Sequence, residues 1–165
     1  MNGMGTHESS SANTTSWLTP PEIVENLGPF DLDPACHNPM PWETADVMLY
    51  ENGLESDWGN SFVWLNPPYG RETFKWLSKL AEHPGGGIAL IFARTETVGF
   101  FSEVWNKADA LLFIESRLSF RLPDGTKAKG NSGAPSVLVA YGDDAKTRLR
   151  ESTIKGAYVE SWKAP

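Results

Sequence analysis

The tetrapeptide Asn66-Pro67-Pro68-Tyr69 combines residue types that could act on a planar amino group. An exocyclic amino group on a base is a poor nucleophile, because its lone pair is delocalised into the ring. Two acceptors aimed at its hydrogens, the Asn66 side-chain oxygen and the Pro67 carbonyl, would localise that lone pair as a methyl group arrives. The prolines fix φ at about −65° and hold both acceptors rigidly, and Tyr69 would stack on a flipped base. The segment therefore predicts methyl transfer to a base amino group.

A plain Pro-Pro turn with an exposed tyrosine is the alternative interpretation of this segment. WW domains bind Pro-Pro-x-Tyr, but Tyr69 follows Pro68 directly, so that spacing is absent. Rarity favours the catalytic interpretation, because proline makes up only about 5% of residues on average. A sulfonium methyl donor is already activated, so positioning supplies most of the effect and no metal is required. Cys36 and the scattered histidines also lack the spacing of a metal site.

The elements that must position this loop can be read from the apolar pattern. We expect a buried strand at 62–65 that runs into the loop, an amphipathic helix at 71–82 and a second buried strand at 88–93. The other expected elements are helices at 20–27 and 97–107, and strands at 29–33, within 45–49, at 110–114 and at 136–141. Strands that alternate with helices predict an α/β domain with a mostly parallel sheet.

Length and composition limit the class of protein. The chain has 165 residues, which suits one domain, and its single cysteine excludes an internal disulfide framework. Residues 1–16 are polar and are expected to form a flexible tail, followed by a domain at 17–145 and a C-terminal extension at 146–165. No signal peptide opens the chain and no apolar run of about 18 residues occurs. We therefore expect a soluble, cytoplasmic protein without a membrane partner.

The charges are unevenly distributed. The net charge is −7, yet the first 60 residues contain ten acidic residues and no Lys or Arg, so every basic residue lies in the remainder. Nucleic acid binding needs Lys and Arg, and a basic hairpin or loop is expected at 117–133, with a Pro-Asp-Gly turn. Arg71, Lys75 and Lys79 recur at helical spacing and could contact phosphates. The alternatives are an ordinary surface hairpin and a solvated helix face. The candidate DNA-binding residues are Arg71, Lys75, Arg117, Arg121, Lys127 and Lys129.

Several motifs, in their order along residues 17–141, resemble the phage-type, Dam-like family of DNA N6-adenine methyltransferases. The matching segments are Trp17-x-Thr19-Pro20, Phe30-Asp31-Leu32-Asp33-Pro34-Ala35, Gly53-Leu54-x-x-Asp57-Trp58, Asn66-Pro67-Pro68-Tyr69-Gly70, Ala93-Arg94-Thr95-x-Thr97 with Phe100 and Phe101, Arg117-Leu118-x-Phe120, and Pro135-Ser136. The resemblance implies a small, Rossmann-like class I methyltransferase fold, S-adenosylmethionine as cofactor, adenine-containing duplex DNA as partner, and a bacterial or phage-infected host cell.

The resemblance also implies roles for individual residues. Trp17, Thr19 and Pro20 would close over the cofactor, and the loop Asp33-Pro34-Ala35 would lie beside its methionine end. Asp57 would accept a hydrogen bond from the cofactor's adenine, Trp58 would stack on it, and Asn66 would contact the cofactor as well as the target base. Taken singly, Trp58 could instead be a core residue, Trp17 a tail anchor and Asp33 part of a turn.

One departure from the methyltransferase pattern concerns the cofactor loop. Many methyltransferases have a glycine-rich turn after the first strand, whereas Cys36-His37-Asn38-Pro39 occupies that place here. No acidic residue stands out for the cofactor's ribose, and Glu43 and Asp46 are the candidates.

The expected activity is transfer of a methyl group from S-adenosylmethionine to N6 of adenine in DNA. The same pair of acceptors suits any planar amino group, so cytosine N4, RNA adenine and a protein glutamine amide are alternative acceptors. A non-catalytic protein that binds the cofactor or DNA is an alternative of another class.

Overall fold

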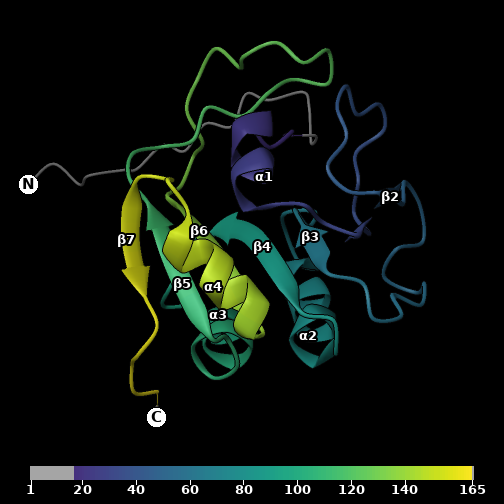
Figure 1. The fold of residues 1–165 in the computed structure, drawn as a ribbon. Coiled ribbons are helices and arrows are strands. Elements are labelled where there is room, and N and C mark those ends of the chain that lie inside the picture. The colour runs from purple at the N-terminus through teal and green to yellow at the C-terminus, as the bar shows by residue number, and fades with distance from the viewer. Residues whose placement is uncertain (1–16, 165) are drawn as a thin grey trace, which may run out of the picture.

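The computed structural model describes residues 17–164, which form a seven-stranded sheet with helices on both faces (Figure 1). The predicted flexible tail, residues 1–16, lies outside the described residues. The helices are α1 (Pro21–Leu27), α2 (Thr73–Glu82), α3 (Val98–Phe100), which continues into the π-helical turn η1 (Phe101–Trp105), and α4 (Asp143–Glu151). The strands are β1 (Leu32–Asp33), β2 (Val47–Met48), β3 (Val63–Leu65), β4 (Gly87–Phe92), β5 (Ala110–Ile114), β6 (Ser136–Tyr141) and β7 (Gly156–Val159).

The sheet is mixed, with the strand order β2-β1-β3-β4-β6-β5-β7. Strands β2, β1, β3 and β4 pair in parallel, whereas β6 pairs antiparallel with both β4 and β5, and β7 pairs antiparallel with β5. The expectation of a mostly parallel sheet is therefore confirmed only in part, because three of the six strand pairings are parallel and three are antiparallel. The reason is the segment between β5 and β6. It brings the chain back into the sheet at the same end at which β5 leaves it, so β6 runs in the opposite direction to β5.

Two apolar layers hold the helices on the sheet. Alternate residues of β4 face opposite sides: Ile88 and Leu90 pack in the layer that contains α1 and α4, while Ala89 and Ile91 pack in the layer that contains α2 and η1. All four side chains are 0–1% exposed. The buried strands therefore form a rigid base under the loops that follow their carboxyl ends.

The predicted C-terminal extension contributes to this core. Helix α4 buries Ala145 and Leu149 against the same layer as α1, and β7 extends the sheet beyond β5. In Figure 1 this segment, drawn in yellow, lies along the sheet rather than apart from it. Among the described residues, no helix is long and apolar enough to cross a membrane.

Candidate active site

The candidate site lies where the chain reverses its direction across the sheet. From β1 the chain crosses to β2 on one side and then returns to β3 on the other side. In open α/β sheets, ligands bind outside the carboxyl ends of the strands at such a switch point. Asp33 ends β1, Asn66 directly follows β3, and the two strands pair at Leu32 and Val63. The structure therefore brings the predicted cofactor loop and the predicted catalytic loop to the same edge.

Asn66 is buried, with 5% of its surface exposed, and both ends of its amide have partners. Its Nδ2 donates to the Trp17 carbonyl over 3.2 Å, and its Oδ1 accepts from the Tyr69 hydroxyl over 3.3 Å. Because the amide nitrogen is held by a carbonyl, which can only accept, the side-chain oxygen must point the other way, toward Tyr69. Trp17 thus reaches the predicted catalytic loop through its backbone.

Tyr69 belongs to a cluster of three aromatic rings. Its ring stacks on Phe92 at the end of β4, with centroids 4.3 Å apart and planes 12° from parallel. The ring of Phe120 meets Tyr69 edge-on at 6.5 Å, and Phe120 also contacts Trp17. Burial raises the pKa of Tyr69, so its hydroxyl stays protonated and acts as a donor at neutral pH.

Thr73, in the first turn of α2, fixes the other end of the predicted catalytic loop. Its hydroxyl donates to the Pro68 carbonyl over 2.7 Å and accepts from the Gly70 backbone N–H over 3.1 Å. Thr73 is buried. The loop is therefore held both by β3, through Asn66, and by the helix that follows it.

Asp33 is the buried carboxylate of the site, with 3% of its surface exposed. It accepts from the Thr44 hydroxyl over 2.5 Å and from the Ala35 backbone N–H over 3.1 Å. Burial raises its pKa to about 6, although these hydrogen bonds lower it. Burial and the Asp33 charge raise the pKa of the neighbouring Cys36 thiol to about 12, so Cys36 stays a protonated, unreactive thiol.

Thr19 has a buried hydroxyl oxygen with no hydrogen-bond partner among the described residues. It stands two positions after Trp17, whose carbonyl holds Asn66. Buried polar groups are normally paired, so this hydroxyl is available to a ligand. The two ribose candidates, Glu43 and Asp46, are exposed residues of the same loop as Thr44, one before it and one after it in the sequence.

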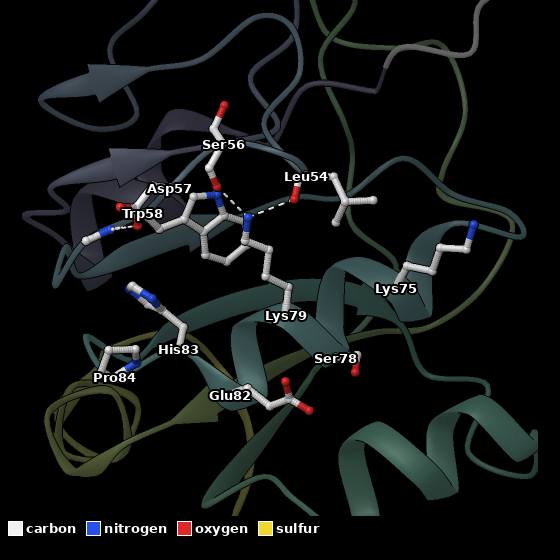
Figure 2. Close-up of a pocket in the computed structure, with 11 residues that line it drawn as sticks. Leu54, Ser56, Asp57, Trp58, Lys75, Ser78, Lys79, Glu82, His83 and Pro84 are labelled. Carbon is white, nitrogen blue, oxygen red and sulfur yellow. Dashed lines mark hydrogen bonds between the residues drawn. The ribbon is translucent and has the colours of Figure 1, made fainter.

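Asp57 lies on a loop that packs against the predicted cofactor loop. A Cβ atom added at Gly53 would lie 1.7 Å from the Pro34 carbonyl oxygen, so only glycine permits this approach. Asp57 itself is exposed and accepts from the Gly59 backbone N–H over 2.9 Å. It lines a cavity of about 710 Å³ between this loop and α2 (Figure 2). The described residues that line this cavity include neither Asp33 nor Asn66.

Trp58 is buried, with 3% of its surface exposed. Its ring stacks on Trp76 of α2, and its indole N–H donates to the Gly53 carbonyl over 2.8 Å. In this arrangement Trp58 supports the Asp57 loop, which agrees with the alternative interpretation of this residue as part of the core.

The basic segment 117–130 has the pairing of a hairpin. Arg121 pairs with Lys127, and Gly125 turns the chain with a φ of +83°. The backbone of Arg121 also pairs with Leu18, and a Cβ atom added at Gly125 would lie 3.6 Å from the side chain of Pro41. The hairpin therefore connects the N-terminal segment with the loop between β1 and β2.

The six candidate DNA-binding residues differ in their surroundings. Arg121 is half-buried, with its guanidinium 3.7 Å from the Glu22 carboxylate, and Lys75 pairs with Glu72 over 2.8 Å. Arg117 is exposed and donates to the Ser132 carbonyl over 3.2 Å. The remaining three are exposed and form no ion pair among the described residues: Arg71, Lys127 and Lys129. These three are the best placed to meet phosphates.

The structure adds four residues that sequence analysis did not assign to the site. These are Thr44, Thr73, Phe92 and Phe120. Phe120 belongs to one of the segments that resemble the Dam-like family, but a ring in an apolar strand or loop carries no sequence sign of its partner. Threonine is mostly found on the surface, so the residue type alone does not mark Thr44 as part of a buried site.

Comparisons with known proteins identify the family of the chain. The family model described as DNA N-6-adenine-methyltransferase (Dam) matches residues 7–157. A protein named DNA N-6-adenine-methyltransferase, from Escherichia phage T1, is 30% identical over 150 residues, which cover 87% of this chain and 60% of the relative. The chain thus spans about three fifths of that relative's length. No solved structure matches. The chain belongs to the DNA N-6-adenine-methyltransferase (Dam) family.

Proposed function

We propose that this protein transfers a methyl group from S-adenosylmethionine to N6 of adenine in DNA. The observation that carries the proposal is the structural environment of the Asn66 side chain. Its amide is oriented by the Trp17 carbonyl, it lies beside the carboxyl ends of β1 and β3, and a stacked aromatic pair adjoins it. The parallel strands on either side of the switch point support a Rossmann-like class I fold.

The chain's buried acceptors suit S-adenosylmethionine, which carries hydrogen-bond donors on its amino group, ribose and adenine. Asp33 offers a buried carboxylate, and Thr19 offers a hydroxyl without a partner among the described residues. We assign the methionine end to the loop Asp33-Pro34-Ala35, with Trp17, Thr19 and Pro20 closing over the cofactor, and the adenine to Asp57. When bound, the cofactor supplies an activated methyl group.

The target amino group would meet two acceptors. A carbonyl oxygen has two lone pairs, so Asn66 Oδ1 accepts from the target amino group as well as from the Tyr69 hydroxyl. The Pro67 carbonyl accepts the second N–H. These contacts favour a pyramidal nitrogen with a localised lone pair. The nitrogen would gain the methyl group as the bond between that carbon and the sulfonium sulfur breaks, with the bonding electron pair left on the sulfur as a neutral thioether. The nitrogen would then release one proton to solvent, which leaves a neutral secondary amine.

The base would lie on the Tyr69 ring, which Phe92 supports from β4. Stacking on an aromatic side chain contributes about 1–3 kcal/mol per base. Base flipping is required because N6 is not accessible to these groups inside a duplex. Arg71, directly after the catalytic loop, and the exposed lysines of the 117–130 hairpin would hold the phosphates on either side.

Identification of the methylated product tests the proposal. The protein is incubated with radiolabelled S-adenosylmethionine and unmodified duplex DNA, and the DNA is digested to nucleosides. We expect label in N6-methyladenine, its loss in Asn66→Ala, and its retention in Asn60→Ala, which changes an exposed asparagine outside the loop. Label in methylcytosine would refute the base assignment. Label in RNA or in protein glutamine, offered in parallel, would identify one of the alternative acceptors, and binding of the cofactor without transfer would indicate a non-catalytic protein.

A further inference from the structure

Lys79 of α2 points into the cavity beside Asp57, where its ammonium group meets two backbone carbonyls (Figure 2). Its Nζ donates to the Leu54 carbonyl over 2.7 Å and to the Ser56 carbonyl over 2.5 Å. Both carbonyls belong to the loop that carries Asp57. Lys79 therefore links this loop to α2 next to Asp57, the candidate acceptor for the cofactor's adenine.

The charge of Lys79 is compensated without a carboxylate among the described residues. Its Nζ lies 4.5 Å from the centroid of the Trp58 ring, and such a cation–π contact contributes about 0.5–2 kcal/mol. Trp58 in turn holds the Gly53 carbonyl. Hydrogen bonds to charged groups contribute about 1.5–3 kcal/mol each, so this set of contacts can order a short loop.

The contacts of Lys79 hold the residues on both sides of Asp57 in the sequence. Ser56, held by Lys79, precedes it, and Trp58, which lies under Lys79, follows it. The Ser56 backbone N–H also donates to the Asn52 carbonyl over 3.0 Å. Asp57 itself is exposed, and within residues 17–164 its carboxylate bonds only locally, to the Gly59 backbone N–H. The direction of its carboxylate therefore depends on neighbours that Lys79 fixes.

We propose that Lys79 is a positioning residue for the donor site, which holds the 54–58 loop on α2 so that the Asp57 carboxylate is set before the donor binds. The inference rests on the proposed function, because it takes the donor's adenine as the ligand of Asp57. Helix α2 then fixes both loops: Thr73 holds the catalytic loop at its first turn, and Lys79 holds the Asp57 loop further along.

The alternative role for Lys79 is a phosphate contact, as its helical spacing from Arg71 and Lys75 suggests. Its hydrogen bonds to Leu54 and Ser56 oppose that role, because they occupy the ammonium group within the protein. The two roles predict different measurements. A positioning role affects donor binding, whereas a phosphate contact affects DNA binding and its salt dependence.

The test compares Lys79→Met, Lys79→Arg and the control Lys107→Met, which changes an exposed lysine that pairs with Glu103 and does not line this cavity. Calorimetry gives the Kd for S-adenosylhomocysteine, and DNA binding is measured at several salt concentrations, well below the melting temperature of each variant. We expect Lys79→Met to raise the donor Kd about tenfold, which corresponds to the loss of one charged hydrogen bond. Lys79→Arg should restore most of the affinity, and Lys107→Met should leave the donor Kd unchanged.

Hydrogen exchange of the free protein separates this inference from the proposed function. We expect the Ser56 and Gly59 amides, which are hydrogen-bonded in the loop, to exchange about tenfold faster in Lys79→Met. A folded Lys79→Met with unchanged exchange and unchanged donor Kd would overturn the inference. So would a loss of DNA affinity with a shallower salt slope and an intact donor Kd. If the wild-type protein binds no donor while Lys79→Met exchanges faster, the proposed function fails and the positioning of the loop stands.

Discussion

The Tyr69 hydroxyl donates a hydrogen bond to the Asn66 side-chain oxygen over 3.3 Å. This oxygen is the acceptor that we assign to the target amino group. Tyr69 therefore contributes two separable properties to the site, a ring for stacking and a hydroxyl that shares the acceptor. Substitutions that remove one property at a time can separate them.

Tyr69→Phe should keep kcat within about threefold of the wild-type value, because the ring remains and Asn66 loses only a competing donor. Tyr69→Ala should lower kcat/KM by about 10- to 100-fold, since a stacked base contributes about 1–3 kcal/mol. Steady-state methylation of duplex DNA measures both. A loss in Tyr69→Phe equal to that in Tyr69→Ala would show that the hydroxyl, rather than the ring, carries the effect.

Phe92→Leu should weaken base flipping, because Phe92 stacks on Tyr69 at 4.3 Å and holds its ring in place. An aromatic pair contributes about 0.5–1.5 kcal/mol beyond its burial, so the flipped fraction should fall by about twofold to tenfold. The fluorescence of 2-aminopurine placed at the target adenine reports flipping. Phe113→Leu is the control, since Phe113 is a half-buried residue of β5 that packs on Trp105. An equal fall in both variants would point to general loosening of the sheet.

Asp33 should make stability depend on pH. Burial raises its folded-state pKa from the ordinary 3.8 to about 6. Because this pKa is raised, the contribution of Asp33 to the free energy of unfolding is fully present below about pH 4 and is lost as the pH rises through 6. The loss amounts to about 3 kcal/mol. Urea unfolding from pH 4 to pH 8 should therefore show Asp33→Asn gaining stability relative to wild type across this window. A difference that does not change with pH would contradict this assignment, and Asp46→Asn, at an exposed position, is the control.

Donor binding should also depend on the ionisation of Asp33, but it should become stronger as the pH rises. The charged form of Asp33 is the one that accepts hydrogen bonds and attracts the donor's ammonium group. Below about pH 6 the Kd for S-adenosylhomocysteine should rise by about tenfold per pH unit, as expected for one required deprotonation. Calorimetry between pH 4.5 and 8 is the measurement. A Kd that is flat across this range would remove Asp33 from the donor site.

The apolar pattern of the sequence predicts individual elements well. It predicts strands at 110–114 and 136–141, and these are the bounds that the structure gives to β5 and β6. Each is a buried apolar run between polar or turn-forming segments, which is the local condition for a buried strand. The position of Asp33 and Asn66 at the same edge of the sheet also follows from the sequence, because Asp33 ends one predicted strand and Asn66 directly follows another.

The sequence does not show which distant segments of the chain pair with each other. Nothing in the local pattern of β6 indicates that it inserts antiparallel between β4 and β5. The contacts of Tyr69 with Phe92 and Phe120 depend on that arrangement. Charge spacing is similarly ambiguous: Lys79 has the helical spacing of a phosphate-binding residue, yet its ammonium group donates to two backbone carbonyls.

The basic hairpin leads to a final prediction about DNA. Lys127 and Lys129 are exposed and form no ion pair among the described residues, whereas Arg121 is half-buried beside Glu22. The double variant Lys127→Gln/Lys129→Gln should weaken DNA binding at all sequences alike and reduce the slope of log K against log salt by about 2, one unit for each phosphate contact. Arg121→Gln should mainly lower the melting temperature, because it removes the guanidinium that links the hairpin to Glu22 of α1. Filter binding across a salt series and thermal unfolding distinguish the two. An unchanged slope in the double variant would show that the hairpin does not contact phosphates and that its link to Leu18 is its main role.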